Sequence, residues 1–186
     1  MVRWEADAAG RLQHAAMSLY LERGYDAVTV AEIAERAGLT KRTFFRHFPD
    51  KREAVFAGAP AFLAAVASGV ADAGPGAAPM DAVLAGFAAG AARLAEYAPY
   101  QRQVRALIAS SADLQEREHV KNAAVAAAVA EALGRRGVDP LTARLAAHAG
   151  GAVFAVAYDR WVDDGATGDL PALLRETRDA MRSVLG

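Results

Sequence analysis

Apolar residues recur at intervals of three and four along most of the 186-residue chain, and no segment alternates apolar and polar residues between hairpin turns. The first spacing places apolar side chains on one face of an α-helix, whereas strict alternation is typical of a half-buried strand. Alanine, leucine, arginine and glutamate, which favour helix, are abundant. The sequence therefore predicts an all-α fold.

Glycine, proline and capping residues divide this pattern into nine predicted helices. Thr29 with Glu32, and Ser110 with Asp113, have the spacing of capping boxes, in which side chains satisfy the free amides of a helix start. Asp139 before Pro140 is a second kind of helix start. The helices are expected over residues 8–23, 30–37, 41–47, 50–71, 80–97, 99–109, 111–134, 140–162 and 169–185.

These helices are expected to form two domains. Residues 1–49 are predicted to be a three-helix domain, and residues 50–186 a larger helical domain. The fourth helix, which begins at Asp50, is expected to run unbroken to the loop at residues 74–79. It would then be the one helix that touches both domains.

Composition excludes several classes of protein. The chain has no cysteine, which rules out disulfides and thiolate chemistry. No stretch approaches the ~20 apolar residues of a membrane span, and the first ten residues lack the layout of a signal peptide, so we expect a cytoplasmic protein without a membrane partner. The four histidines are scattered, and Glu116 and His119 have ligand-like spacing but no matching second motif. We therefore expect neither an enzyme nor a cofactor nor a bound metal.

The charge is distributed unevenly. The net charge is −1, yet residues 39–52 carry five basic side chains against one acidic side chain, Asp50. A local basic surface on an otherwise acidic molecule is typical of a regulator with one edge facing DNA. Charge alone is equally consistent with a solvated face. The basic residues of this segment are Lys41, Arg42, Arg46, Lys51 and Arg52.

The same segment has the form of a helix-turn-helix. Two short helices are joined by a turn that contains Gly38. On the second helix, Arg42, Phe45 and Arg46 share one face, while Phe44 and Phe48 lie on the other as a buried anchor. Cations near the start of such a helix reach base edges in the major groove, and groups at helix ends are better suited to phosphates. We expect Lys41 and Arg42 to read bases, and Thr29, His47 and Lys51 to contact phosphates. Arg46, on the same face as Arg42, is also expected to contact DNA.

The run GYDAVTVAEIAERAGLTKRTFFRHFPDKREAVFA, residues 24–57, resembles the DNA-binding domain of the tetracycline-repressor (TetR) family. The resemblance extends upstream through Leu12–Ala16 and Leu21–Arg23. Two positions depart from the family pattern, because Phe45 stands where tyrosine is usual and Arg42 where glycine is common. A purely structural role as helix caps is the alternative for Thr29 and Thr40. The resemblance implies DNA contacts at Thr29, Thr40, Lys41, Arg42, Thr43, Phe45, His47 and Lys51.

Residues 58–186 resemble the regulatory part of that family only in helix count and layout. A weaker similarity, through residues 112–118 and Trp161, is to members that sense acyl-CoA-like ligands. Many alanines opposite larger side chains favour a cavity for an apolar effector, with Arg93, Arg105 and His148 as polar candidates. A plain core is the alternative, and for His148 a packed histidine is favoured. The expected lining is Phe62, Val66, Phe87, Leu94, Tyr97, Val104, Arg105, Leu107, Ile108, Phe154 and Tyr158.

The dimer interface is expected on the last two helices. Two adjacent glycines, Gly150 and Gly151, cost about 1 kcal/mol each in a helix, and close approach of another helix is a reason to tolerate them. Two helices from each copy would form a four-helix interface. The expected residues are Ala149, Gly150, Ala152, Val153, Val156, Leu173, Thr177 and Met181.

The sequence thus predicts a ligand-responsive transcriptional regulator, expected to be a repressor. It would bind a pseudo-palindromic operator in double-stranded DNA as a homodimer and be released by a small, largely apolar effector that is acyl-CoA-like or otherwise apolar. An activator, or a ligand-independent regulator of the same fold, is the alternative. A helical ligand-binding module that does not bind DNA would leave the basic segment unexplained.

Overall fold

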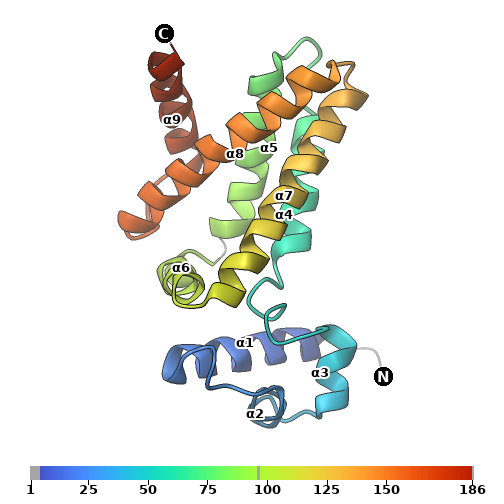
Figure 1. The fold of residues 1–186 in the computed structure, drawn as a ribbon, viewed down its shortest axis with the longest axis vertical. Helices are drawn as coiled ribbons and strands as arrows, with labels where there is room; N and C mark the ends of the chain where they lie inside the picture. The colour runs from blue at the N-terminus through green and yellow to red at the C-terminus, as the bar shows by residue number, and fades with distance from the viewer. Residues whose placement is uncertain (1–4, 96, 186) are drawn as a thin grey trace. The chain divides into compact units, whose positions relative to one another are not determined.

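The structure, a computed structural model, describes residues 5–95 and 97–185, and most of these residues lie in helices. Residues 1–4, which belong to the segment compared with a signal peptide, lie outside these ranges. No strand occurs in the described ranges, which confirms the all-α prediction (Figure 1). None of the described helices is both long and apolar enough to cross a lipid bilayer. The helices are α1 (Glu5–Arg23), α2 (Val30–Arg36), α3 (Lys41–His47), α4 (Ala59–Ala71), α5 (Pro79–Ala95), the 3-10 helix η1 (Ala98–Tyr100), α6 (Gln101–Ala109), α7 (Ala112–Arg135), α8 (Pro140–Asp163) and α9 (Leu170–Leu185).

The helices group into two compact units. The first, here called the reading unit, comprises residues 1–58 together with residues 103–118. The second comprises residues 59–102 and 119–186. The division therefore falls inside α6 and again inside α7. The first turns of α7 belong to the reading unit although they lie far along the chain from α1–α3.

The prediction of one helix over residues 50–71 is wrong, because α4 begins only at Ala59. Pro60 explains the difference. In a helix that started at Asp50, this proline would stand in the interior, where it has no N–H to donate and its ring crowds the preceding turn. At the second position of α4 that N–H is not needed. Residues 51–58 form turns instead, in which the Asp50 carboxylate accepts hydrogen bonds from the backbone N–H groups of Arg52 and Glu53.

The core of the reading unit follows the predicted pattern. Leu12, Ala16 and Leu19 of α1 are buried, as are Ile33 of α2 and Phe44 of α3. Figure 1 shows α2 and α3 beside α1. The turn between α2 and α3 needs a glycine, because Gly38 has φ +64°, where a side chain would be strained.

The second unit contains unusually close helix pairs. A Cβ on Gly86 of α5 would lie 2.6 Å from the carbonyl oxygen of Val66 in α4, and one on Gly90 would lie 2.8 Å from the Phe62 ring. Gly150 makes the same kind of contact between α8 and α5, because its Cβ would lie 2.2 Å from a methyl group of Val83. The glycines therefore permit approach between helices of one chain, and the expectation that Gly150 faces a second copy is corrected. Its partner helix is α5.

We predict that Gly150→Ala lowers the free energy of unfolding by about 1–3 kcal/mol, because the added methyl group overpacks the contact with Val83. Gly134→Ala is the matched control, since Gly134 is also helical but its Cβ would meet nothing within 4 Å. It should raise the free energy of unfolding by about 0.5–1 kcal/mol through helix propensity. Urea unfolding at one protein concentration measures both changes, and equal effects of the two variants would contradict the packing argument.

Candidate nucleic-acid interface

Helix α3 has an aromatic face and a basic face. Phe44 is fully buried and Phe48 nearly so, and their ring centroids are 5.5 Å apart. This confirms both as core residues. Lys41 and Arg42, in the first turn of the helix, are exposed. Since residues four apart share a helix face, burial of the two phenylalanines fixes the rotation of α3 and holds the cations in solvent.

The start of α3 is closed by two threonines. The Thr40 hydroxyl oxygen accepts a hydrogen bond from the Thr43 backbone N–H at 3.1 Å, and the two hydroxyl oxygens are 3.0 Å apart. Both residues are predicted to contact DNA. Their hydroxyl groups are therefore held in position by each other at the end of the helix that carries Lys41 and Arg42.

The start of α2 is a complete capping box, as predicted. The backbone N–H and the hydroxyl of Thr29 donate to the Glu32 carboxylate at 2.8 and 2.7 Å, and the Glu32 N–H donates to the hydroxyl oxygen. Arg23 adds an ion pair to Glu32 at 2.8 Å. The hydrogen bonds from Thr29, followed by the bond from Arg23, lower the pKa of Glu32 to about 2. Thr29, a predicted phosphate contact, thus already donates within the protein.

Lys51 is also engaged inside the reading unit. Its ammonium donates to the carbonyl oxygens of Tyr25 and Val28 at 3.0 and 3.1 Å, and it lies 4.1 Å from the centroid of the Tyr25 ring. The Tyr20 hydroxyl in turn donates to the Lys51 carbonyl oxygen at 2.7 Å. Lys51, another predicted phosphate contact, therefore ties the segment after α3 to the segment between α1 and α2.

The other predicted DNA contacts lie along the rest of α3. Phe45 is 55% exposed, and its ring meets the Phe44 ring edge-on. Arg46 is exposed, whereas His47 is partly buried, and its Nε2 atom has no hydrogen-bond partner among the described residues. The exposed Phe45 ring gives the exposed side of α3 an apolar surface beside its cations.

The first turns of α7 are bound to the reading unit by charged side chains that sequence reasoning missed. Arg117 forms a two-pronged ion pair with Glu53, with one N–O distance of 2.9 Å, and its guanidinium lies 5.4 Å from the centre of the Phe56 ring. Both charged side chains are about three-quarters buried. We call this contact the Arg117–Glu53 pair.

Asp113, one turn earlier in α7, faces the same part of the unit. Its carboxylate accepts from the Tyr25 hydroxyl at 3.4 Å and lies 3.7 Å from Arg52. Burial, reinforced by Asp113, raises the pKa of Tyr25. Asp113 therefore does not form the predicted capping box with Ser110, whose hydroxyl donates to the Leu107 carbonyl oxygen. No local pattern could have revealed pairs of residues separated by more than 60 positions.

Family models match both parts of the chain. Residues 12–57 match the model described as "Bacterial regulatory proteins, tetR family". Residues 77–186, more than half of the chain, match the TetR-type model described as "MftR C-terminal domain". The chain belongs to the TetR family of transcriptional regulators. The members of this family are DNA-binding regulators rather than enzymes.

Curated relatives match this chain over a short stretch. An uncharacterised HTH-type transcriptional regulator of Mycobacterium bovis is 43% identical over 61 residues, which is 33% of this chain and 32% of that protein. The HTH-type transcriptional regulator TcmR of Streptomyces glaucescens is 50% identical over 38 residues, 20% of this chain and 17% of that protein. The chain thus matches about a third or less of the length of these relatives.

Solved structures match over nearly the whole chain and show the shared fold. The fatty acid degradation regulator FadR of Bacillus halodurans has a TM-score of 0.60 at 17% identity, covering 92% of this chain and 93% of its own. FadR of Thermus thermophilus, a TetR-family repressor in complex with lauroyl-CoA, has a TM-score of 0.55 at 20% identity, with coverage of 92% and 91%. SmeT in complex with triclosan has a TM-score of 0.62 at 17% identity, with coverage of 93% and 90%.

In this TetR-family chain the predicted effector residues belong to both compact units. In the second unit, the ring of Phe154 contacts the rings of Phe62, Phe87 and Tyr158, with centroid distances of 4.9–6.0 Å, and we call these four residues the aromatic cluster. Tyr158 also donates to the buried Gln101 side chain at 2.8 Å. Val66 is buried in the same core as this cluster and Leu94 is partly buried, whereas Tyr97 is exposed. Four predicted lining residues belong instead to the reading unit, namely Val104, Arg105, Leu107 and Ile108.

The predicted interface residues are likewise divided. Gly150, Val153 and Thr177 are buried within their own chain, which corrects their assignment to a surface between copies. Ala152 and Val156 are exposed, and Ala149, Leu173 and Met181 are partly exposed. Sequence reasoning missed Leu141 and Leu145 of α8, although both are more than 60% exposed. They lie four residues apart, a spacing that a helical plot would have shown. His148 is exposed on the same helix rather than packed.

The structure gives Lys41 and Lys51 different roles. We predict that Lys51→Met lowers the free energy of unfolding by about 1–3 kcal/mol, because two carbonyl groups lose a charged donor. Lys41→Met should change the free energy of unfolding by less than about 0.5 kcal/mol. It should weaken binding to all DNA sequences and lower by about one the salt slope, which is the slope of the logarithm of the binding constant against the logarithm of the salt concentration. Urea unfolding and DNA binding at several salt concentrations measure both. A Lys51→Met protein with wild-type stability and a reduced salt slope would instead support a phosphate contact.

Proposed function

We propose that this TetR-family chain is a repressor that binds a pseudo-palindromic operator as a homodimer and leaves it when a small, largely apolar effector binds. The observation that carries the proposal is the pair of exposed cations, Lys41 and Arg42, on a helix whose opposite face is anchored by buried phenylalanines. Arginine and lysine on guanine are the commonest specific contacts in the major groove. Arg42 is proposed as the main base-reading residue.

The homodimer is proposed to form through the exposed side of α8. Leu141, Leu145, Ala152 and Val156 are all exposed there and share one side of the helix, although the opposite side is packed in the core. Exposed large apolar side chains at helical spacing are typical of a surface that another helix covers. A second copy supplies an identical apolar surface, and two copies place two reading helices on two half-sites.

The effector is proposed to bind near the aromatic cluster of the second unit. Stacked rings supply apolar surface, and the hydrogen bond between Tyr158 and Gln101 supplies polar groups that could orient a ligand. The ligands of structurally similar regulators have the same character, because lauroyl-CoA and stearoyl-CoA are bound in FadR proteins and triclosan in SmeT. We propose an effector with a large apolar part for this chain as well.

Helix α7 is proposed to carry the signal, in place of the unbroken fourth helix that the sequence predicted. α4 begins at Ala59 and does not extend into the reading unit, whereas α7 has residues in both units. Its first turns are held by the Arg117–Glu53 pair and by Asp113. An effector that displaces α7 would therefore act on the reading unit through these charged contacts.

Two variants separate DNA reading from dimerisation. Arg42→Ala should cost about 1–3 kcal/mol at an operator selected from random DNA and relax preference at one base position, while the protein remains dimeric. Val156→Glu should place a charge in the proposed interface, yield monomers at micromolar concentration and weaken operator binding. Light scattering and binding to operator and random duplexes measure these effects. Equal weakening of operator and random DNA by Arg42→Ala would contradict base reading, and a monomeric wild type would contradict the dimer.

Two further variants test the route through α7. With lauroyl-CoA and triclosan as probes, at least one should weaken operator binding of the wild type by about 5–150-fold, the usual range of allosteric coupling. Arg117→Gln should still bind the active probe but lose most of this response. Arg135→Gln, which breaks an exposed pair with Glu131 on the same helix, should respond like wild type. If the active probe released operator DNA from Arg117→Gln as fully as from the wild type, the role of α7 would be contradicted. If neither probe bound the protein, the proposed effector class would be contradicted.

A further inference from the structure

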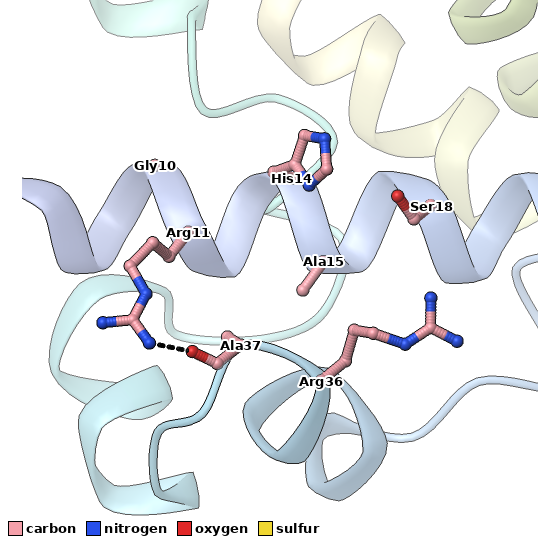
Figure 2. Close-up of a pocket in the computed structure, with 7 residues that line it drawn as sticks. All are labelled: Gly10, Arg11, His14, Ala15, Ser18, Arg36 and Ala37. Atoms are coloured by element: carbon pink, nitrogen blue, oxygen red, sulfur yellow. Dashed lines mark hydrogen bonds between the residues drawn. The ribbon is translucent and has the colours of Figure 1, made fainter.

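The reading unit contains a hollow that the proposed DNA contacts do not use. It has a volume of about 570 Å³ and lies between α1 and the end of α2 (Figure 2). Its lining comes from two short segments of the chain, which are Gly10–Ser18 and Arg36–Ala37. Both segments belong to the reading unit. The lining residues are Gly10, Arg11, His14, Ala15, Ser18, Arg36 and Ala37.

Small residues create the hollow. Ala15 of α1 and Ala37 after α2 are buried and face each other where the two helices meet, and Gly10 adds no side chain (Figure 2). The larger neighbours extend sideways rather than inward. Figure 2 shows the Arg11 and Arg36 side chains on opposite sides of this alanine floor. The space between the helices is therefore left unfilled, and its two flanks are cationic.

Both guanidinium groups are fixed in place by other parts of the unit. Arg11 donates to the Ala37 carbonyl oxygen at the end of α2. Arg36 forms a two-pronged ion pair with Glu22, with N–O distances of 3.0 and 2.9 Å. Each guanidinium carries five N–H donors, so these bonds leave donors available on both arginines. None of the residues that line the hollow is acidic, while His14 and Ser18 add an imidazole and a hydroxyl to its rim.

We propose that this hollow binds a phosphate group. Guanidinium forks match phosphate oxygens two at a time, and Arg11 and Arg36 lie on opposite flanks, so a phosphate group in the hollow can meet a guanidinium at either flank. The alternative, a purely structural role for the arginines, explains their bonds to Ala37 and Glu22 but not the empty space between them. A volume of 570 Å³ lies within the range of small-molecule sites and exceeds the size of one phosphate. The site therefore has room for the organic part of a phosphate ester.

The phosphate can come from either of two sources. One is a free small phosphate ester, and the other is the sugar–phosphate backbone of DNA beyond the groove that α3 reads. The chemistry of recognition is the same for both, and the inference does not depend on the proposed operator or effector. Inorganic phosphate is the simplest probe because it tests the shared chemistry directly.

The test is a titration of the full chain with inorganic phosphate at constant ionic strength, followed by calorimetry and by backbone amide NMR. We expect saturable binding with the largest shifts at residues 10–18 and 36–38. Arg36→Gln should raise the dissociation constant by about 10-fold or more, as expected for loss of a charge-assisted hydrogen bond. Ser18→Ala, which removes only the hydroxyl, should raise it less. Arg11 is left unchanged because it also holds the end of α2.

Arg23→Gln is the matched control. Arg23 lies on the same helix as Ser18 and is 43% exposed with an ion pair to Glu32, whereas Arg36 is 45% exposed with an ion pair to Glu22. The two substitutions therefore remove the same charge from similar surroundings, but Arg23 does not line the hollow. Phosphate binding to Arg23→Gln should stay within about twofold of wild type. Thermal unfolding of each variant checks that all remain folded.

A random-sequence 20-base-pair duplex distinguishes the sources. If backbone phosphate occupies the site, the duplex should displace inorganic phosphate, and Arg36→Gln should lower the salt slope of duplex binding by about one while Arg23→Gln does not. If the natural ligand is a free ester, phosphate should bind equally well with the duplex present. The proposal is overturned if phosphate shows no saturable binding and Arg36→Gln leaves the salt slope unchanged. It is also overturned if Arg23→Gln weakens either kind of binding as much as Arg36→Gln.

Discussion

Burial of Phe44 is the constraint on which the rest of the reading unit depends. This ring is fully buried in the middle of a seven-residue helix, and Phe48 packs against it from one turn later. A helix of that length is not stable by itself, so its packing determines whether it exists at all. Truncating a buried phenylalanine typically costs about 3–5 kcal/mol, more than any single surface contact of α3 supplies. The direction in which Lys41 and Arg42 point is therefore set from the core.

Some charged residues of the unit bond to other parts of the protein and others face solvent. The sequence alone could not show which residues belong to each group. Lys41 and Lys51 look alike in a basic segment, but one is exposed and the other donates to two backbone carbonyl groups. Thr29 is similar, since its hydroxyl closes the capping box with Glu32. A count of basic residues in a segment gives its charge. It does not show which of those side chains already donate hydrogen bonds to backbone carbonyl groups. The predicted DNA contacts are thus a mixture of groups that face solvent and groups that hold α3 in place.

Features of the fold that depend on neighbouring residues could be predicted, and features that depend on distant ones could not. The boundaries of α2 and α3 follow from capping and glycine signals within a few positions. The start of α4 could also have been predicted from Pro60. Asp50, a typical helix-capping residue, instead favoured an earlier start that the structure does not have. Gly150 is different. A glycine inside this helix predicts the close approach of another helix. Only the structure shows that the other helix is α5 of the same chain. The pattern of small and apolar residues identifies the face of a helix that makes a contact, but it does not identify the element that this face contacts.

The energies involved are consistent with the proposal that a few side chains on α7 are sufficient for regulation. A coupling of 5–150-fold corresponds to about 1–3 kcal/mol. A hydrogen bond to a charged group contributes about 1.5–3 kcal/mol, and the Arg117–Glu53 pair is about three-quarters buried, so solvent screens it only in part. Loss of this pair would by itself cover most of the coupling range. On the proposed route through α7, release of DNA would not require the core around Phe44 to open. It would require only that α7 favour a position in which Arg117 and Asp113 no longer meet their partners, and that the effector bind this position more tightly.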